Sequence, residues 1–354
     1  MVDRVLLAEP RGFCAGVEMA IKALSWMVTL FEPPVYCYNE IVHNKLVVDR
    51  FREMGVIFVE DVTSVPAGAP LMLSAHGSAP EVVAAASQHG RTVINAVCPL
   101  VTKVHHEAKI RARDGFTILY VGHHGHDEAV GALAVAPDSM HLVERTEDVA
   151  AIAGVVTDRS RVALLAQTTL SMGEWNGIAD AARQSFPDLW TATRNDLCFA
   201  TTNRQTALSA IARDSDAVVV IGSANSSNTL ALAKVASELC DTVVRVDTAE
   251  ELDAHQFPEH GVVGVTAGAS APEDLVQAVI ATLAPSSGVE RVHVTDEDEY
   301  FPPPRELRDL IVGVATFFAM FSGAGADTVR SDIAVYDRSN TASAVLSSLG
   351  ASDE

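Results

Sequence analysis

Short apolar runs alternate with amphipathic stretches along most of the chain. Residues 162–166 and 217–221 contain only apolar side chains, as expected for strands that are covered on both faces. The first amphipathic stretch, residues 17–31, repeats apolar side chains at steps of three and four, which is the period of a helix. The alternation of the two patterns predicts an α/β fold with parallel strands.

The same two patterns give a list of expected elements. The apolar runs predict strands at 5–8, 35–38, 56–59, 71–75, 92–96, 116–121, 162–166, 189–193, 217–221, 243–246 and 262–266. The amphipathic stretches predict helices at 17–31, 44–54, 80–88, 100–113, 172–183, 202–212, 228–240 and 271–283.

The chain changes character after about Glu297. Residues 301–304 read Phe-Pro-Pro-Pro, which interrupts regular structure, and residues 310–326 form a run of 17 without a charged side chain. That run is just shorter than the ~18 residues of a membrane span, so we expect it to be buried or at an interface. Residues 331–354 are polar and rich in small side chains, which predicts a frayed end.

Cys14, Cys98 and Cys198 each lie between a predicted strand and a predicted helix. Because α/β folds place their functional sites at such junctions, the three thiols could converge on one metal. Their spacings of 84 and 100 residues suggest three similar units, 1–97 with the N-terminal strand, 98–196 and 197–297, followed by an appendage at 298–354.

Spacing alone leaves the chemistry of the cysteines open. Structural zinc sites draw on short Cys-x-x-Cys pairs, which this chain lacks, whereas iron–sulfur clusters accept widely separated thiolates. Cysteines are also often plain core residues, a role that Cys37 and Cys240 fit. A metal site and three buried cysteines therefore remain alternatives at this point.

The composition is that of a globular protein, and its charge limits the partners. The 354 residues are 48% hydrophobic and include 25 basic against 46 acidic side chains, a net charge of −21. This balance argues against contact with nucleic acid or anionic membranes. The N-terminus has no signal-peptide pattern, so we expect a cytoplasmic protein whose five cysteines stay reduced.

Two loops have the composition of an anion site. Ser226, Ser227 and Asn228 come just before or at the start of one predicted helix, and Ser270 comes just before another. Free N–H groups and short hydroxyls at a helix N-terminus bind phosphate. The alternative is that Asn228 and Ser270 are ordinary N-caps.

Three loop histidines, His43, His76 and His126, could add donors for a diphosphate. Glu128 lies two residues after His126, where a carboxylic acid could deliver a proton to a bound ligand. The alternatives are histidines with structural roles and a glutamate that only favours the first turn of a helix.

A series of short motifs occurs in order along the chain. They are Pro-Arg-Gly-Phe-Cys-Ala-Gly-Val at 10–17, Val-His-Asn-Lys at 42–45, Ser-Ala-His-Gly at 74–77, Cys-Pro-Leu-Val-Thr-Lys-Val-His at 98–105, Gln-Thr-Thr-Leu-Ser at 167–171, Cys-Phe-Ala-Thr-Thr-Asn-Arg-Gln at 198–205, Ser-Ser-Asn at 226–228 and Thr-Ala-Gly-Ala-Ser-Ala-Pro at 266–272. From about Val5 to Arg308 the chain closely resembles the 4-hydroxy-3-methylbut-2-enyl diphosphate reductase family.

The resemblance implies a fold of three similar α/β domains in a pseudo-threefold trefoil around one 4Fe-4S cluster, which Cys14, Cys98 and Cys198 would hold. It implies the last step of the non-mevalonate isoprenoid pathway. In that step an allylic diphosphate loses its hydroxyl by reduction at the open iron and gives isopentenyl and dimethylallyl diphosphates.

The resemblance also implies roles for single residues, carried over by matching motif. The substrate-binding residues would be His43, His76, His126, Thr168, Ser226, Ser227, Asn228 and Ser270, and Glu128 would be the catalytic proton donor. Since no Gly-x-Gly-x-x-Gly fingerprint follows a predicted strand, we expect electrons from a reduced ferredoxin or flavodoxin. The apolar appendage suggests a homodimer contact.

The chain departs from the family pattern near Cys98 and Glu128. Asn95 and Val97 replace an aspartate and a threonine, Ala132 replaces a threonine, and Met19 stands where a basic residue is common. Loss of polar groups next to a metal ligand lowers affinity or activity. The alternatives are a diverged relative acting on another hydroxylated diphosphate, a non-catalytic iron–sulfur sensor, and a three-cysteine dehydratase or synthase acting on carboxylates.

Overall fold

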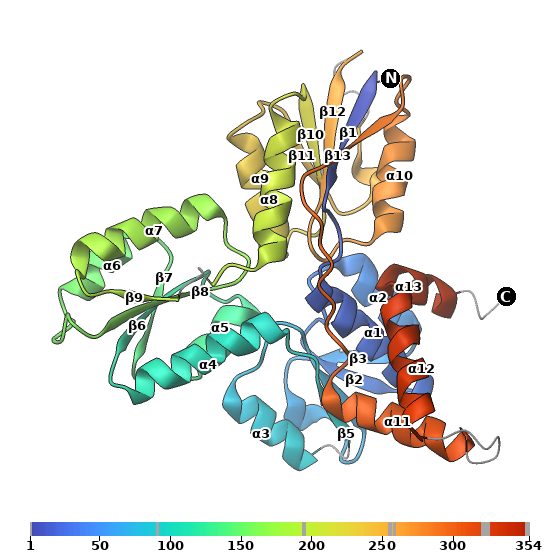
Figure 1. Cartoon of the computed structure of the whole chain (residues 1–354), viewed down its shortest axis with the longest axis horizontal. Helices are drawn as coiled ribbons and strands as arrows, with labels where there is room; N and C mark the ends of the chain where they lie inside the picture. The colour runs from blue at the N-terminus through green and yellow to red at the C-terminus, as the bar shows by residue number, and fades with distance from the viewer. Residues whose placement is uncertain are drawn as a thin grey trace. The chain divides into compact units, whose positions relative to one another are not determined.

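The strands of the computed structural model form three parallel sheets with helices packed beside them, so the predicted α/β class is confirmed (Figure 1). The structure describes residues 2–89, 92–192, 196–253, 257, 260–319 and 326–350. The chain divides into two compact units. The first unit comprises Met1–Gly12, His76–Pro80 and Pro99–Glu297, and the second comprises Phe13–Ala75, Glu81–Cys98 and Asp298–Glu354.

The second unit contains a four-stranded sheet with the order β3-β2-β4-β5. Its first elements are α1 (Ala15–Leu30), β2 (Val35–Tyr38), α2 (Lys45–Glu53), β3 (Val56–Val59), a 3-10 turn (Val62–Ser64), β4 (Pro70–Leu73), α3 (Pro80–His89) and β5 (Thr92–Asn95). Cys37 of β2 lies opposite Met72 of β4. Ile21, Leu24 and Met27 of α1 are fully buried in the same core as these two residues.

The C-terminal part of the second unit is helical, with α11 (Arg305–Ala319), α12 (Ala326–Ser339) and α13 (Ala342–Gly350). Leu307 and Ile311 of α11 and Ala342 and Leu346 of α13 join the core that contains α1. Each pair is spaced by four residues, which gives each helix an apolar side for packing. The predicted frayed end is therefore wrong for the described residues.

The apolar run predicted at 310–326 falls only partly within the described residues, since 320–325 lie outside them. Ile311 is buried, but Phe317 and Phe318 are 59% and 67% exposed. Burial of the whole run is wrong for this reason, while an interface at the two phenylalanines stays a prediction. No helix in the described part of the chain is long and apolar enough to cross a bilayer.

One flank of α1 holds the C-terminal helices. Lys22 is buried, and its Nζ lies 3.3 Å from the buried Oδ2 of Asp337 and donates a hydrogen bond of 2.8 Å to the Asp337 carbonyl. Tyr300 donates its hydroxyl proton to the same carboxylate at 2.6 Å. One turn earlier in α1, Glu18 accepts a 2.6 Å hydrogen bond from the N–H of Ala342, the first residue of α13. Two side chains four residues apart therefore fix α12 and α13 to α1.

The first unit contains two sheets. One has the order β7-β6-β8-β9. Its elements are α4 (Pro99–Arg113), β6 (Thr117–Val121), α5 (Asp127–Leu133), β7 (Met140–Val143), α6 (Thr146–Ala153), β8 (Val162–Ala166), α7 (Met172–Ser185) and β9 (Trp190–Thr191). All of β8 is buried, which explains its uninterrupted apolar sequence.

The other sheet of the first unit has the order β11-β10-β12-β1-β13. Its elements are β1 (Arg4–Glu9), α8 (Phe199–Ala212), β10 (Ala217–Ile221), α9 (Ser227–Ser237), β11 (Val243–Val246), a 3-10 turn (Ala249–Glu251), β12 (Val262–Ala267), α10 (Glu273–Leu283) and β13 (Val289–His293). The N-terminal strand β1 lies between β12 and β13 and pairs with both in parallel. Strand β1 therefore belongs to the sheet formed by residues 217–293. The predicted domain boundaries at residues 97, 196 and 297 stay predictions.

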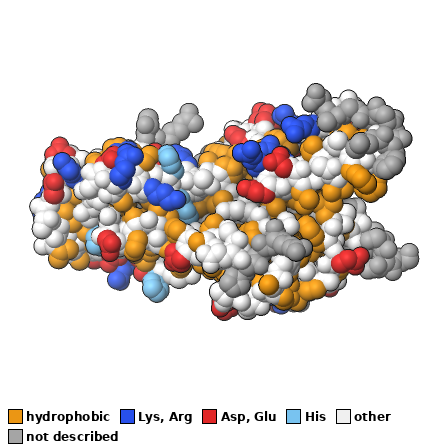
Figure 2. Space-filling model, turned by 90° about the horizontal axis from the view of Figure 1, so that it is seen from below, with side chains coloured by type: hydrophobic (Ala, Val, Ile, Leu, Met, Phe, Trp, Pro, Cys, Tyr) orange, Lys and Arg blue, Asp and Glu red, His pale blue; other side chains and the backbone are white. Residues whose placement is uncertain are grey.

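Charged side chains of both signs share the surface. On the face shown in Figure 2, basic side chains lie among acidic and apolar ones. The net charge of −21 is thus not spread as one continuous acidic surface on this face.

Replacing Lys22 with methionine should lower the free energy of unfolding by about 3 kcal/mol, because the buried Asp337 carboxylate loses its cation. Urea titration measures the difference from the wild type. Arg52→Met is the matched control, since Arg52 pairs with Asp49 at 2.7 Å on an exposed surface, where an ion pair contributes at most about 1 kcal/mol. Equal stability of Lys22→Met and the wild type would show that this pair does not hold the C-terminal helices.

Candidate active site

Two of the three candidate cysteines meet at Gly16 in the second unit. Cys14 is the N-cap of α1, and Cys98 directly precedes α4 and donates its N–H to the Ala75 carbonyl at 3.0 Å. A Cβ at Gly16 would lie 2.8 Å from Sγ of Cys98 and 3.9 Å from Sγ of Cys14. Only glycine fits at this position, because any side chain would overlap the Cys98 sulfur. Both sulfur atoms therefore lie near the Cα of Gly16.

The five cysteines fall into two groups by environment. Cys14, Cys98 and Cys198 are partly exposed, and Cys198 is the N-cap of α8 just as Cys14 is that of α1. N–H groups at a helix N-terminus favour negative charge on a neighbouring atom, as a thiolate metal ligand requires. Cys37 is fully buried, which raises the pKa of its thiol. Cys240 is partly exposed, but it follows the end of α9 and its Sγ donates to the carbonyl of Ser215 at 3.5 Å. These last two fit the predicted structural role.

Glu128 and Thr168, both predicted site residues, are in direct contact in the first unit. Glu128 lies in the first turn of α5 and is 3% exposed. The N–H of Thr168, just after β8, donates to its Oε1 at 2.7 Å, and the Thr168 hydroxyl donates to its Oε2 at 3.1 Å. Burial raises the pKa of Glu128 to about 7, although the two hydrogen bonds from Thr168 lower it. The carboxyl group is therefore about half protonated near neutral pH.

His126 and His76 lie at the start of α5 within the first unit. Nδ1 of His126 accepts a hydrogen bond of 3.2 Å from the N–H of Glu128, so His126 caps α5. The ring of His76 lies 6.2 Å from the ring of His126, and its Nδ1 is 3.7 Å from Oδ2 of Asp127. His43 belongs to the second unit, where its Nδ1 is 3.5 Å from Oε2 of Glu40. The structure thus brings together His76, His126 and Glu128.

The serine and asparagine loops are joined to each other. Ser226 is the N-cap of α9, and its hydroxyl accepts from the N–H of Thr229 at 3.3 Å. Asn228 is not a cap, because its Oδ1 accepts from the N–H of Ala269 at 2.9 Å and so links the two loops. Ser270 is buried two residues before Pro272, the N-cap of α10. The alternative of ordinary N-caps at Asn228 and Ser270 is therefore wrong.

Gln167, Thr169 and His123 are polar residues at strand ends that had no predicted functional role. Gln167 follows β8 and donates from Nε2 to the hydroxyls of Thr169 and Ser227 at 2.8 and 3.0 Å. Nδ1 of His123 lies 3.5 Å from the Ser227 hydroxyl. In the sequence, only the position of Gln167 beside Thr168 indicated a role in the site. Its hydrogen bond to Ser227 of α9 depends on tertiary packing, which the sequence does not show.

Arg204, a further residue without a predicted role, is fully buried in α8. Its Nε donates to the Gly12 carbonyl at 3.0 Å, and its Nη1 lies 2.9 and 3.0 Å from the two carboxylate oxygens of Glu297. Gly12 has a φ of +65°, and a Cβ there would be 3.1 Å from the Ala271 carbonyl. The Arg204 side chain therefore connects α8, which starts after Cys198, to the loop that follows β1.

The departure at Asn95 keeps one hydrogen bond. Oδ1 of Asn95 accepts from the N–H of Val97 at 3.1 Å, a role that an aspartate oxygen would also perform. The turn that leads to Cys98 is thus held by an asparagine. Ala132 of α5 is fully buried in an apolar cluster, which its methyl side chain fits, and Met19 is buried in α1.

The fold and these side chains define an α/β protein with thiols at helix N-termini and a buried carboxyl group, groups that an enzyme with a metal cofactor would use. The family model described as LytB protein matches residues 5–284. The 4-hydroxy-3-methylbut-2-enyl diphosphate reductases of Rhodopirellula baltica and Leifsonia xyli are 43% and 45% identical over 307 and 313 residues. These alignments cover 86% and 88% of this chain and 96% and 92% of the relatives.

Comparison with solved structures agrees. The structure of the reductase from Plasmodium falciparum covers 89% of this chain and 99% of its own, with a TM-score of 0.85 and 31% sequence identity. The chain belongs to the LytB protein family, a family of iron–sulfur oxidoreductases.

The raised pKa of Glu128 predicts a pH-dependent loss of stability. A buried carboxyl group that holds its proton up to about pH 7, against 4.5 in the unfolded chain, stabilises the folded state at low pH. That contribution is lost as the pH rises from about 4.5 to 7. The free energy of unfolding of the wild type, relative to Glu128→Gln, should therefore fall by roughly 2–3 kcal/mol between pH 4 and 8. Urea titrations at several pH values measure this, and a constant difference would contradict the buried, protonated carboxyl group.

Proposed function

We propose that this chain catalyses the reductive dehydroxylation of 4-hydroxy-3-methylbut-2-enyl diphosphate to isopentenyl and dimethylallyl diphosphates. The family membership and the names of its relatives support this activity. The observation that carries it is the buried carboxyl group of Glu128, with a pKa near 7, held by both hydrogen-bond donors of Thr168. A reaction that expels hydroxide needs such an acid at neutral pH.

A single 4Fe-4S cluster held by Cys14, Cys98 and Cys198 is the cofactor in this proposal. The donor set fits, because each of the three thiols is partly exposed and lies next to a helix N-terminus, and Gly16 lets the Cys98 sulfur approach the start of α1 closely. When bound, a cluster with three cysteine ligands supplies single electrons and an iron that can act as a Lewis acid. Zinc is disfavoured by the absence of paired short spacings.

The diphosphate is assigned to the polar loops. The N–H groups at the start of α9 and the buried hydroxyls of Ser226, Ser227 and Ser270 offer donors, and the Asn228 side chain fixes the two loops together. The imidazole rings of His43, His76 and His126 would complete the donor set. A diphosphate needs several donors that are fixed before it binds, and the hydrogen bonds of Gln167 to Ser227 and Thr169 provide such order.

Glu128 is the proton donor in this scheme. At neutral pH about half of the molecules carry a proton on this carboxyl group, which can be passed to the leaving hydroxyl so that it departs as water. Thr168 keeps the carboxyl group in one orientation and would contact the substrate beside it. Exclusion of bulk water around a side chain that is 3% exposed protects the reactive allylic group.

Partners follow from the chemistry and from the surface. Electrons are assigned to a reduced ferredoxin or flavodoxin in the cytoplasm, because no dinucleotide fingerprint follows a strand in the sequence. Phe318 of α11 and Val335 of α12, 67% and 65% exposed, support a homodimer contact through the C-terminal helices. Sedimentation as a monomer, unchanged by Phe318→Ser with Val335→Ser, would remove the dimer from the proposal.

Reconstituted protein given a chemical reductant and 4-hydroxy-3-methylbut-2-enyl diphosphate should form both isoprenoid diphosphates, measured by mass spectrometry. Glu128→Gln should lower kcat by about 10²- to 10⁴-fold with an unchanged iron content, because the acid is lost. Glu147→Gln is the control, since Glu147 is an exposed acid in the first turn of α6. Absence of product from the fully loaded wild type, or full turnover by Glu128→Gln, would contradict the proposal.

Gly16→Ala should reduce the bound iron per chain at least several-fold, because the new methyl group would lie 2.8 Å from the Cys98 sulfur. Gly173→Ala is the matched control: Gly173 is also the second residue of a helix, and its Cβ would meet nothing within 4 Å. Iron and sulfide analysis after anaerobic reconstitution compares the two. Equal iron content would show that the space beside Cys14 and Cys98 is not the site of the metal.

A further inference from the structure

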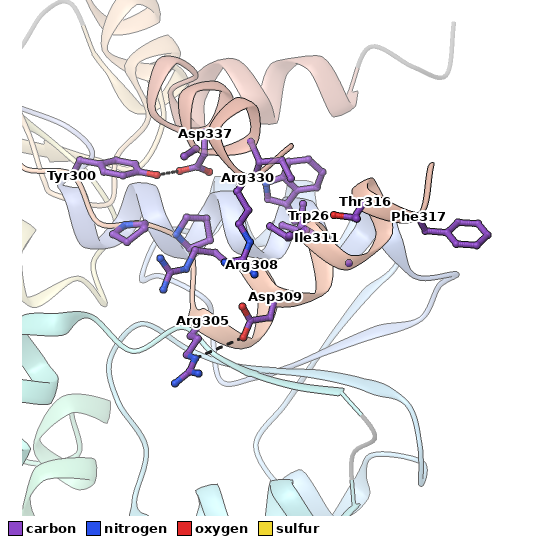
Figure 3. A pocket seen from close by; sticks show the side chains of 16 residues that line it. Trp26, Tyr300, Arg305, Arg308, Asp309, Ile311, Thr316, Phe317, Arg330 and Asp337 are labelled. Carbon is purple, nitrogen blue, oxygen red and sulfur yellow. Dashed lines mark hydrogen bonds and ion pairs between the residues drawn. The ribbon is translucent and has the colours of Figure 1, made fainter. Parts of the chain in front are cut away.

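A pocket of about 1050 Å³ lies within the second unit, between α1, residues 300–303, α11 and α12 (Figure 3). The family match ends at residue 284, so all of its lining except Trp26 comes from the part of the chain beyond that match. Its volume is that of a site for an organic ligand. The cysteines and Glu128 do not line it, and it is therefore separate from the candidate active site.

One wall of the pocket is apolar and aromatic. Trp26 of α1, Ile311 and Phe317 of α11 and Ile333 of α12 line it. Figure 3 shows Trp26, Ile311 and Thr316 gathered on one side, with Phe317 at the outer end. Such a wall matches a hydrocarbon body rather than a small inorganic ion.

Another part of the lining is cationic, which is unusual in a chain with a net charge of −21. Arg305 and Arg308 of α11 and Arg330 of α12 contribute three guanidinium groups. Arg305 lies 3.7 Å from Asp309, but among the described residues neither Arg308 nor Arg330 forms an ion pair or a side-chain hydrogen bond. Guanidinium groups bind phosphate and carboxylate with two parallel hydrogen bonds.

The acidic side of the lining does not cancel this charge. Asp337 is 2% exposed, and Lys22 and Tyr300 already bind its Oδ2. Its Oδ1 and the hydroxyl oxygen of Thr316 are buried, and neither has a hydrogen-bond partner among the described residues. Buried polar atoms without partners are rare in folded proteins, which makes this polar corner of the lining unusual.

We propose that this pocket binds an amphiphilic organic phosphate, with its hydrocarbon body against Trp26 and Phe317 and its phosphate on Arg308 and Arg330. The apolar wall, the two unpaired guanidinium groups and the volume carry the proposal together. The site is independent of the proposed reductase activity, because it shares no residue with that site.

The test is anaerobic calorimetry of the full, cluster-loaded chain with octyl phosphate as the probe, and with inorganic phosphate and octyl glucoside as probes of each part alone. Octyl phosphate should bind at least tenfold more tightly than either. Arg308→Gln with Arg330→Gln should weaken octyl phosphate binding on the order of tenfold or more, since two charge-assisted contacts are lost. Phe317→Ala should weaken octyl phosphate but leave inorganic phosphate unchanged.

The matched control is Arg52→Gln with Arg113→Gln, two exposed helix arginines outside the pocket, which should bind octyl phosphate like the wild type. Binding that survives Arg308→Gln with Arg330→Gln would place the ligand elsewhere, for instance on the serine loops, and overturn the proposal. Absence of octyl phosphate binding by the wild type, or binding equal to that of octyl glucoside, would overturn it as well.

Discussion

The close approach of Gly16 to two sulfur atoms is the constraint on which the second unit depends. The space between α1 and Cys98 excludes even one methyl group, because a Cβ would lie 2.8 Å from that sulfur. The same helix carries Glu18 and Lys22, which hold α13 and α12 through a partly buried and a buried polar contact. Helix α1 therefore holds both the candidate metal ligand Cys14 at its start and the C-terminal helices along its flank. Any shift of α1 would disturb both.

The first unit applies a second constraint, the burial of a carboxyl group. No cation among the described residues pairs with Glu128, and two hydrogen bonds from Thr168 do not offset the loss of water, so its pKa rises to about 7. Gln167, next to Thr168, orders Ser227 on α9. Of the two neighbouring residues after β8, Thr168 thus lowers the pKa of Glu128 and Gln167 orders the loop assigned to the diphosphate. Fixed polar groups of this kind are how a site lowers a barrier without reorganising during the reaction.

Much of the fold could be predicted because buried parallel strands are continuous apolar runs. The predictions at 35–38, 56–59, 162–166, 217–221 and 243–246 coincide with β2, β3, β8, β10 and β11. Strand β13 escaped prediction because it is mostly exposed and contains Glu290 and Arg291, and α12 because its sequence is polar and short of apolar repeats. For the site, motifs predicted the cysteines, Glu128 and Thr168, and the structure places the last two in contact. The roles of Gly16, Gln167 and Arg204 depend on which surfaces approach each other, and local sequence does not contain that information.

A Mössbauer spectrum of the anaerobically purified, iron-enriched chain tests the central claim most directly, recorded with and without 4-hydroxy-3-methylbut-2-enyl diphosphate. The account predicts about four iron atoms per chain in one cluster, with the signal of a single iron changed by the diphosphate, because three cysteines leave one iron open. A chain that holds zinc in place of iron, or a cluster whose spectrum the diphosphate leaves unchanged, would contradict it.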